Sequence, residues 1–530
     1  MLDREMKKKG KKLQSIKLKK NIKIFLGVLF FFVVGVSFYV NSTPQNKRSG
    51  FFNRGTRGLP NVDTAEIVYL RDGDTYDLEA SYVTKEIGNN KIRMVAYNGS
   101  VPGPFIHIEQ GAEITINFIN NLDLEGTIHH HGLRLDFPFD GTPGVSQEEV
   151  APGEVFTYKL KFPDAGTYWY HPHVREDYAM DLGLYGNYRV EPKEYEYSPV
   201  NRELGLIIDD ILIKDGEVVP HFRDKTNFAL MGRFGNIMLV NGDTDFELDV
   251  DAGEVVRLHF TNVANVRPFE LTIPKARMKL VGSDISPYER EEFIEKLLIT
   301  PSERYIVDVY FPEEGAYSLV HTSHDSALGE RSYTLAKFNA RGKVVAEDFS
   351  RQFLTLKSYP NVTNEVAPLR EYLYKSPDRK LRLSLDAGEV DLGSAMENMP
   401  CHKMPDGTWM GECTPETKEE WLAGLSADEM ALGGETIHWE DHMYVLNEQI
   451  TNEDIKWELI DEDTGKVSEE INDWKFRLGD LVKVRIFNDP MSAHPMQHPI
   501  HFHGQRFVVL SRNGVPETNM VWKDTTLAKV

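Results

Sequence analysis

A ten-residue strand pattern recurs three times along this chain and limits its fold more than any other feature. Residues 111–120 read GAEITINFIN, residues 253–262 read GEVVRLHFTN and residues 479–488 read GDLVKVRIFN. Each copy begins with Gly, ends with Asn and alternates apolar with polar side chains, which is typical of a half-buried β-strand. Three copies predict three domains of similar design, a number that suits a chain of 530 residues.

A second element repeats in register with the first. Residues 152–171 (PGEVFTYKLKFPDAGTYWYH) match residues 301–321 (PSERYIVDVYFPEEGAYSLVH), and equivalent Pro, Phe and Gly residues keep the same spacing in both copies. Period-two alternation interrupted by Gly, Pro and Asn-Gly turns indicates antiparallel β-structure. We therefore predict an all-β chain whose β-sandwich domains cover residues 61–195, 196–345 and 346–530.

The third domain is predicted to be interrupted and incomplete. Its repeated strand lies farther from the second copy than the second copy lies from the first, which indicates an insertion at about residues 387–440. By the spacing in the first two domains, the third copy of the GTYWYH element is expected beyond Val530. The sequence is therefore interpreted as a fragment of a longer protein.

The start of the chain differs from the rest. Residues 1–50 carry twelve Lys or Arg side chains against two acidic ones, and an uncharged apolar run of 17 residues begins at Ile24. We interpret residues 1–23 as a basic cytoplasmic tail, residues 24–40 as an uncleaved transmembrane anchor and residues 41–60 as a linker. The domains would then lie outside the cytoplasm, held at the cell membrane. A cleaved signal segment, which would give a secreted or periplasmic protein, is the alternative.

Charge and cysteine content narrow the classes of partner and compartment. The formal net charge is −22, although the first 50 residues are basic. An acidic body repels nucleic-acid phosphates, so we predict no nucleic-acid partner. The two cysteines are Cys401 and Cys413. An exported compartment permits a disulfide between them, with surface copper binding as the alternative.

The histidines gather in three short runs, which are His129-His130-His131, His171-Pro172-His173 and His498-Pro499-Ile500-His501-Phe502-His503. Residues i and i+2 of a strand face the same side, so each run can direct two imidazoles to one point. His498 is an odd number of residues from both His501 and His503, which assigns it to a different centre. Imidazoles bind Zn, Cu, Fe or Ni, and six paired histidines exceed what one zinc ion needs. A multinuclear cluster is therefore favoured.

These runs resemble motifs of the multicopper oxidase family. The first two runs, with NGSVPGP at residues 98–104 and DGTPG at residues 140–144, are similar to its first-domain motifs. HPIHFHGQRFVVLSRNG at residues 498–514, followed by WKDT at residues 522–525, is similar to its third-domain signature. The resemblance extends over about residues 61–530 outside the insertion. It implies cupredoxin-like Greek-key sandwiches and, in the complete protein, four copper ions of types 1, 2 and 3.

The resemblance also implies a role for each residue of the runs. His129 and His501 would bind the type 2 copper, and His498 would bind the type 1 copper, where electrons enter. The type 3 pair would be held by His131, His171, His173 and His503. Asp140 would relay protons to the cluster, although an Asp-Gly pair suits a plain turn equally well. Together these centres would couple one-electron oxidation of a substrate to four-electron reduction of dioxygen to water.

One family motif does not occur in the 530 residues. This His-Cys-His run supplies the type 1 cysteine and two type 3 ligands, and neither Cys401 nor Cys413 lies in such a run. The fragment as printed is therefore expected to be inactive. In its complete form the protein is expected to be an oxidoreductase that oxidises Cu(I), another metal ion or small phenolic compounds.

The insertion bears on the choice of substrate. Thioethers bind Cu(I) well, and the insertion contains Met396, Met399, Met404, Met410 and Met430. This composition favours a cuprous oxidase, whereas a flexible loop with core-filling methionines is the alternative. A rival hypothesis for the whole protein is an exported copper-binding or copper-storage protein without oxidase turnover.

Overall fold

The computed structural model describes residues 50–325, 329–342, 345–388, 390, 402–403, 409–410, 414–416, 437–441 and 443–529. The chain forms two units. Among the described residues, the smaller unit contains residues 50–52 and 222–224, where the rings of Phe51 and Phe222 stack with their centroids 4.7 Å apart. The larger unit, Asn53–His221 with Lys225–Val530, contains all three copies of the repeated strand.

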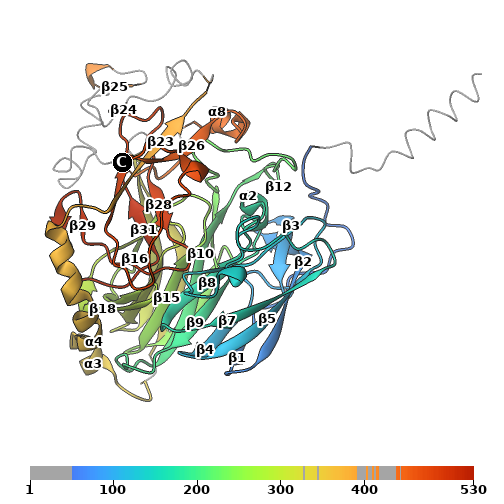
Figure 1. The fold of residues 1–530 in the computed structure, drawn as a ribbon. Helices are drawn as coiled ribbons and strands as arrows, with labels where there is room; N and C mark the ends of the chain where they lie inside the picture. Colours follow the sequence, from blue (N-terminus) through green and yellow to red (C-terminus); the bar gives the residue numbers. More distant parts are fainter. Residues whose placement is uncertain are drawn as a thin grey trace, which may run out of the picture. The chain divides into compact units, whose positions relative to one another are not determined.

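The first domain is built from two sheets, with strand orders β3-β2-β5-β7 and β1-β4-β9-β8-β6 (Figure 1). Alternating side chains of both sheets are buried, for example Leu78 and Ile116 from one sheet and Ile106 and Val190 from the other. The bounds of its strands are β1 Ile67–Leu70, β2 Thr75–Ile87, β3 Asn90–Tyr97, β4 Phe105–Glu109, β5 Glu113–Asn120, β6 His129–His131, β7 Val155–Lys161, β8 Gly166–His171 and β9 Gly186–Glu191.

The second domain repeats this design, with strand orders β13-β10-β15-β20-β17-β18 and β14-β22-β21-β16-β19. Apolar side chains of both sheets form one buried cluster that includes Val256, Val307, Leu319 and Phe338. The bounds are β10 Arg202–Ile211, β13 Ile237–Val240, β14 Phe246–Asp251, β15 Val255–Asn262, β16 Phe269–Thr272, β17 Arg277–Ser283, β18 Ser286–Ile294, β19 Leu297–Ile299, β20 Arg304–Tyr310, β21 Gly315–Asp325 and β22 Gly329–Arg341, with a small hairpin of β11 Ile213–Lys214 and β12 Glu217–Val218.

The repeated strand occupies the same place in each domain. β5 pairs in parallel with β2 and antiparallel with β7, and β15 pairs in parallel with β10 and antiparallel with β20. The prediction of mostly β-structure is confirmed, but the expected antiparallel pairing holds only in part, because β2 with β5 and β10 with β15 are parallel. Alternation reports which face of a strand is buried and says nothing of the direction of its neighbour, so mixed sheets give the same pattern.

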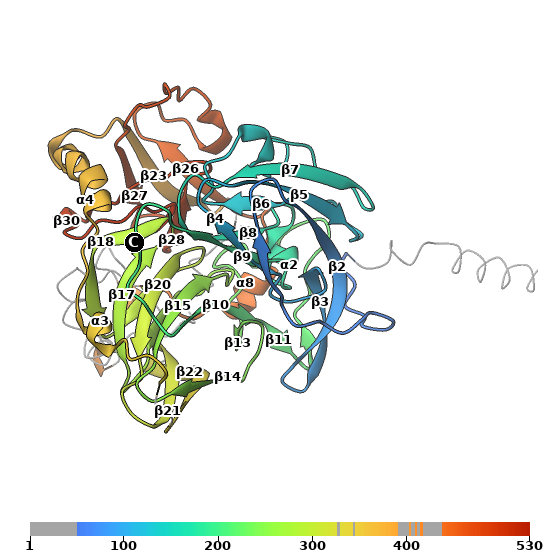
Figure 2. The same cartoon turned by 90° about the horizontal axis from the view of Figure 1, so that it is seen from below.

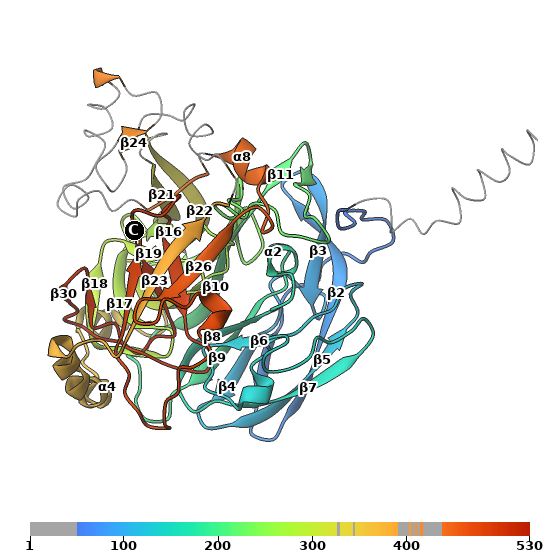
Figure 3. The same ribbon diagram turned by 45° about the horizontal axis from the view of Figure 1, so that its top comes forward.

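The third domain contains the third copy as β27 (Val484–Asn488), which pairs in parallel with β23 (Arg379–Asp386). The other neighbour of β23 is the antiparallel strand β26 (Lys456–Asp461), which lies beside it in Figure 3. No strand of the described residues pairs with the other edge of β27. Accordingly Leu481 and Phe487 of this copy are 56% and 43% exposed. A separate pair, β28 (His498–His501) with β31 (Thr525–Ala528), carries the third histidine run. Short pairs are β24 His402–Lys403 with β25 Trp409–Met410, and β29 Ser511–Arg512 with β30 Val515–Pro516.

Helices are few and short, as the scarcity of helical periodicity predicts. α3 (Ser350–Leu354) contacts β20, and α4 (Pro360–Val366), continued by the 3₁₀ helix Ala367–Tyr374, contacts β18 on the second domain (Figure 2). Other helices among the described residues are α2 Glu176–Ala179, α8 Tyr444–Gln449 and the 3₁₀ turns Phe137–Phe139 and Ser468–Glu470. α2 begins five residues after the end of β8, and its first residue enters the site described below.

Several predictions fall outside the described residues. They are the basic tail, the anchor at residues 24–40, the disulfide between Cys401 and Cys413, and the side chains of the five insertion methionines. Within the part of the chain that is described, no helix is long and apolar enough to cross a membrane.

Candidate metal centre

Two neighbouring strands of the first domain bring its histidine runs together. β6 and β8 are antiparallel, and His129 lies directly opposite His171 in their register. The His129 ring centroid lies 5.5 Å from that of His131, 5.4 Å from that of His171 and 5.6 Å from that of His173. The i, i+2 spacing within β6 thus places both imidazoles beside those of β8.

The third domain adds two further imidazoles to the same group. β28 ends at His501, whose ring stacks on that of His131 with centroids 3.7 Å apart. The His503 ring stacks on that of His129 with centroids 4.1 Å apart. We call the six residues His129, His131, His171, His173, His501 and His503 the histidine cluster.

Backbone carbonyls fix the orientation of three of these rings. The Nδ1–H groups of His129, His171 and His501 donate to the carbonyls of Asp140, Pro172 and Asp524, at 2.7, 2.8 and 2.7 Å. In all three rings Nε2 is buried and has no hydrogen-bond partner. A buried nitrogen with a free lone pair is costly unless something else occupies it, and this arrangement is that of a metal-ligating histidine held by its second nitrogen.

Carboxylates hold two more rings. His173 Nδ1 donates to Glu176 Oε1 at 2.8 Å, and His503 Nδ1 donates to Asp140 Oδ2 at 2.9 Å. Burial raises the pKa of Asp140, but hydrogen bonds from His503 and Thr142 outweigh it and hold the pKa below its usual value. Burial lowers the pKa of His173, and the Glu176 carboxylate more than reverses this and raises it.

His131 is held differently. Its Nε2 lies 2.8 Å from the Thr525 hydroxyl and 3.3 Å from Asp524 Oδ1, while that hydroxyl donates to Asp524. Since the hydroxyl donates to the carboxylate, it accepts from His131 Nε2–H, and the lone pair is then on Nδ1. Both partners come from the WKDT segment of the third domain, so residues far apart in the sequence orient this ring.

Burial favours the neutral form of four rings of the cluster, those of His129, His131, His171 and His501. It lowers the pKa of His171 to about 3 and that of His501 to about 4, and it moves the pKa of His129 and His131 well below the usual value. Neighbouring imidazoles add to the effect at His129, because a second positive charge nearby is unfavourable. Neutral imidazole is the form that binds metals.

His498 lies apart from the cluster, as the odd spacing predicts. Its described ring contact is with Trp457, at a centroid distance of 4.8 Å, and burial lowers its pKa to about 4. Its Nε2 is also buried without a hydrogen-bond partner. The middle residue of the first run, His130, points elsewhere: its Nδ1 hydrogen-bonds the Tyr188 hydroxyl at 2.9 Å.

The donor set fits copper. Ligand atoms of His129, His131 and His501 lie within 4.8 Å of one another, as do those of His129, Asp140 and His503. Six imidazoles suit a borderline metal such as Cu and exceed the four ligands of one tetrahedral zinc ion. The assignment of single histidines to copper types stays a prediction from resemblance.

Sequence reasoning missed the residues that hold these rings. Glu176, Thr525 and Asp524 each form a hydrogen bond or an ion pair with a histidine of the cluster. Arg304 donates hydrogen bonds to Asp524. Arg304 offers one signal in hindsight: in the repeated PGEV and PSER segments it stands where the first domain has the exposed Val155. A fully buried arginine replacing an exposed valine points to a partner outside its own domain.

Comparison with known proteins agrees with this geometry. Three family models, each described as multicopper oxidase, match residues 79–195, 210–342 and 440–529. The chain is 26% identical over 363 residues to a copper resistance protein A homolog of Pseudomonas syringae pv. tomato, covering 60% of this chain and 57% of that protein. It is 26% identical over 375 residues to the iron transport multicopper oxidase FET3 of Gibberella zeae, covering 68% of this chain and 59% of that one.

A solved structure shows the same fold. A variant of the McoA multicopper oxidase from Aquifex aeolicus superposes with a TM-score of 0.57 at 20% identity, covering 89% of this chain and 90% of that one. The chain spans less than two thirds of the length of the two relatives named above. The three family models together match more than half of the chain, in the order of its three domains. The chain therefore belongs to the multicopper oxidase family, whose members are copper-binding oxidoreductases that use dioxygen.

Proposed function

We propose that the complete protein is an enzyme that couples one-electron oxidation of a substrate to four-electron reduction of dioxygen to water. The observation that carries this proposal is the convergence of six imidazoles from the first and third domains, three of them with a buried and unpartnered Nε2. A storage protein needs ligands for copper but no shared multinuclear site, so this arrangement favours the oxidase.

The residues of the cluster have distinct tasks in this scheme. The histidine cluster would hold type 2 and type 3 copper, and His498 would hold the type 1 copper; bound copper supplies the electron transfer to dioxygen. Asp140 is 8% exposed and accepts from His503 Nδ1 and from the Thr142 hydroxyl. A carboxylate in this place, ionised and beside the site, can accept and pass on protons that water formation consumes.

The substrate is proposed to be Cu(I), with other metal ions and small phenols as alternatives. Described residues at the C-terminal end of the insertion contact the segment that immediately precedes His498 in the sequence. The His438 amide donates to Gln497 Oε1 at 3.0 Å, Gln497 Nε2 donates back to the His438 carbonyl at 2.9 Å, and the rings of His438 and His494 have centroids 5.6 Å apart. This end of the insertion therefore reaches the segment that carries the proposed electron entry.

The oxidase proposal is tested on the complete natural gene product with two reductants. We expect dioxygen uptake with Cu(I) and, more weakly, with a phenol, with water rather than peroxide as the product. Leu is similar to Met in volume but lacks the sulfur, so a variant with Leu at the insertion methionines should lose Cu(I) oxidation by about tenfold or more, as loss of a metal-tuning contact does. Its phenol oxidation should be unchanged or raised.

The control is the same variant's phenol activity, which a folding defect would lower in parallel with Cu(I) oxidation. The substituted methionines are Met396, Met399, Met404, Met410 and Met430. Equal Cu(I) turnover in both proteins would reject Cu(I) as the substrate bound there. Copper binding without any dioxygen uptake would favour the rival function, an exported copper-binding or storage protein.

For location we propose that residues 24–40 anchor the protein in the cell membrane, with the domains outside the cytoplasm. The proposal rests on the uncharged apolar run behind a lysine-rich start. A protease applied to intact cells should release the acidic body and leave the basic tail protected. Release of the body without protease would indicate signal cleavage instead, and a body protected inside intact cells would reject export altogether.

A further inference from the structure

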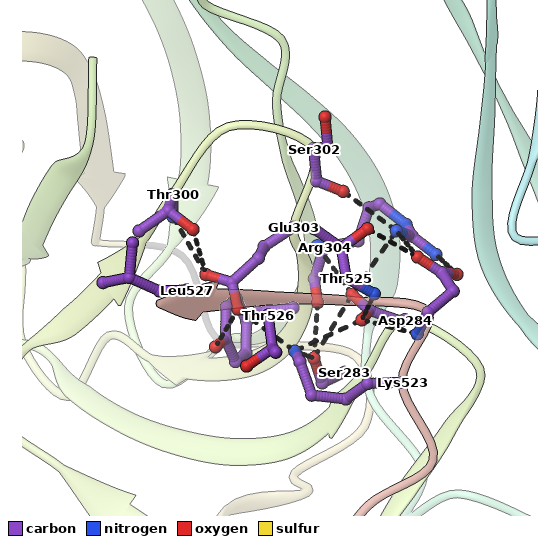
Figure 4. A network of polar contacts seen from close by, with 12 residues as sticks. Ser283, Asp284, Thr300, Ser302, Glu303, Arg304, Lys523, Thr525, Thr526 and Leu527 are labelled. Atoms are coloured by element: carbon purple, nitrogen blue, oxygen red, sulfur yellow. Dashed lines mark hydrogen bonds and ion pairs between the residues drawn. The ribbon is translucent and has the colours of Figure 1, made fainter. Parts of the chain in front are cut away.

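The second domain supplies none of the seven candidate ligands, yet one of its side chains reaches the cluster. Arg304, the first residue of β20, is 0% exposed. Its Nε donates to the Thr167 carbonyl of the first domain at 2.9 Å and its Nη1 to the Ser302 carbonyl of its own domain at 2.9 Å. Nη1 and Nη2 also donate to the two carboxylate oxygens of Asp524 in the third domain. One guanidinium thus joins all three domains. Figure 4 shows Arg304 beside Ser302 and Asp284.

Asp524 in turn contacts candidate ligands from two domains. Its carboxylate lies 3.3 Å from His131 Nε2, and its backbone carbonyl accepts from His501 Nδ1 at 2.7 Å. The rings of His131 and His501 are the stacked pair with centroids 3.7 Å apart. Any rotation or shift of Asp524 therefore changes how these two imidazoles face each other.

Glycines of the first domain make room for this ion pair. Gly132 directly follows His131, and a Cβ at this position would lie 2.9 Å from Asp524 Cγ and 3.2 Å from Arg304 Nη2. A Cβ at Gly166, the first residue of β8, would lie 2.9 Å from Cα of Ile285, beside Asp284. The network therefore lies against the backbone of both strands that carry the first-domain histidines.

Among the charged residues around Arg304, the other cation, Lys523, does not take over its ion pair with Asp524. Asp284, Glu303 and Asp524 are buried carboxylates, and Lys523 is the second cation among them, 3.2 Å from Asp284 and 3.3 Å from Glu303 (Figure 4). Without Arg304, three carboxylates would face one lysine whose ion pairs are with Asp284 and Glu303. Asp524 would then be a buried charge that has lost its guanidinium partner and keeps the Thr525 hydroxyl and the His131 imidazole beside it, which is strongly unfavourable.

We propose that Arg304 is a positioning residue for the copper centre: by clamping Asp524 against Thr167, it sets the relative orientation of His131 and His501. The proposal rests on the copper centre described above. A planar guanidinium offers two parallel donors to a carboxylate and a third to a carbonyl, a geometry that an ammonium group cannot reproduce. Arg304→Lys keeps the charge but releases the orientation of Asp524.

The chain offers a matched control in the same sheet. Arg257 of β15 is 2% exposed and also binds one carboxylate through two nitrogens, with Asp308 as its partner, Nε–Oδ1 at 2.8 Å and Nη2–Oδ2 at 3.0 Å. None of its hydrogen bonds goes to a residue of the histidine cluster. Arg257→Lys should cost folding stability in the same way as Arg304→Lys without touching the ligands.

The test compares both variants with the wild-type chain after loading with Cu(II). We measure copper per chain, the rate of copper release to a chelator, the electron paramagnetic resonance spectrum and the melting temperature of the metal-free protein. Arg304→Lys should weaken copper retention about 10- to 100-fold, the range found for partners of metal ligands, and change the Cu(II) hyperfine splitting. Arg257→Lys should lower the melting temperature similarly and keep wild-type copper binding and spectrum.

The proposal would be overturned if Arg304→Lys retained copper like the wild-type chain and had the same electron paramagnetic resonance spectrum. Equal copper loss in Arg304→Lys and Arg257→Lys would also overturn it. If Arg304→Lys does not fold, the copper binding of Asp524→Asn is compared with that of Asp308→Asn. Both substitutions keep the side-chain shape and remove one negative charge. Copper loss in Asp524→Asn alone supports the clamp, and wild-type retention in Asp524→Asn rejects it. A wild-type chain that binds no copper would instead contradict the copper centre itself.

Discussion

Replacing Gly141 with Ala is expected to lower the free energy of unfolding of the metal-free chain by about 3–4 kcal/mol. Gly141 follows Asp140 and has φ +86°, a conformation that costs a residue with a side chain about 1 kcal/mol. A Cβ there would also lie 2.8 Å from the His129 amide nitrogen and closer still to the Ile128 carbonyl. The strand that begins at His129 would have to move, so copper binding should weaken together with stability.

Gly144 is the matched control for this substitution. It belongs to the same DGTPG segment and has φ +68°, but a Cβ there meets nothing within 4 Å. Gly144→Ala should therefore cost only the backbone contribution, about 1 kcal/mol, and leave copper binding intact. Thermal melts of both variants with and without copper measure the difference. Equal losses in the two would show that the close approach of Gly141 to β6 does not matter.

Replacing His129 with Ala is expected to remove copper from the cluster almost completely. Its ring contacts those of His131, His171, His173, His501 and His503, with centroid distances between 4.1 and 5.6 Å. It also belongs to both groups of side chains whose ligand atoms lie within 4.8 Å of one another. Loss of a shared ligand should exceed the roughly 10- to 100-fold effect of an outer partner. Copper per chain after desalting measures it.

His321 provides the control for a buried histidine outside the cluster. It is 0% exposed, its Nε2 has no hydrogen-bond partner, and burial lowers its pKa to about 3, so by itself it resembles a ligand. Its described ring neighbours are Phe269, Tyr333 and Trp439. His321→Ala should destabilise the second domain and keep the full copper content. Equal copper loss in His321→Ala would mean that unfolding, rather than ligand loss, explains the His129→Ala result.

The features of the fold that depend only on neighbouring residues along the chain were predictable from the sequence. Alternation with period two depends only on neighbours along the strand, so β5, β15 and β27 could be located from the sequence. The parallel pairing of β2 with β5, and of β10 with β15, could not be read in this way. It depends on which distant strand completes the sheet, and the alternating pattern is the same for either direction.

The histidines of the site were predictable for a related reason. In β6 the i, i+2 spacing places His129 and His131 side by side, and the odd spacing separates His498 from His501. The residues that hold His131 were not predictable. Asp524 and Thr525 reach His131 from the far end of the chain, and Arg304 reaches Asp524 from another domain. Such contacts form only after three domains have packed together, and no local pattern encodes them.

The central claim, that histidines from the first and third domains form one copper centre, is tested most directly by anomalous X-ray diffraction. Crystals of the copper-loaded chain would be measured on both sides of the copper absorption edge. We expect anomalous peaks between His129, His131 and His501, bounded by His171, His173 and His503. Copper peaks confined to other surfaces of the chain, with none among these six imidazoles, would contradict it.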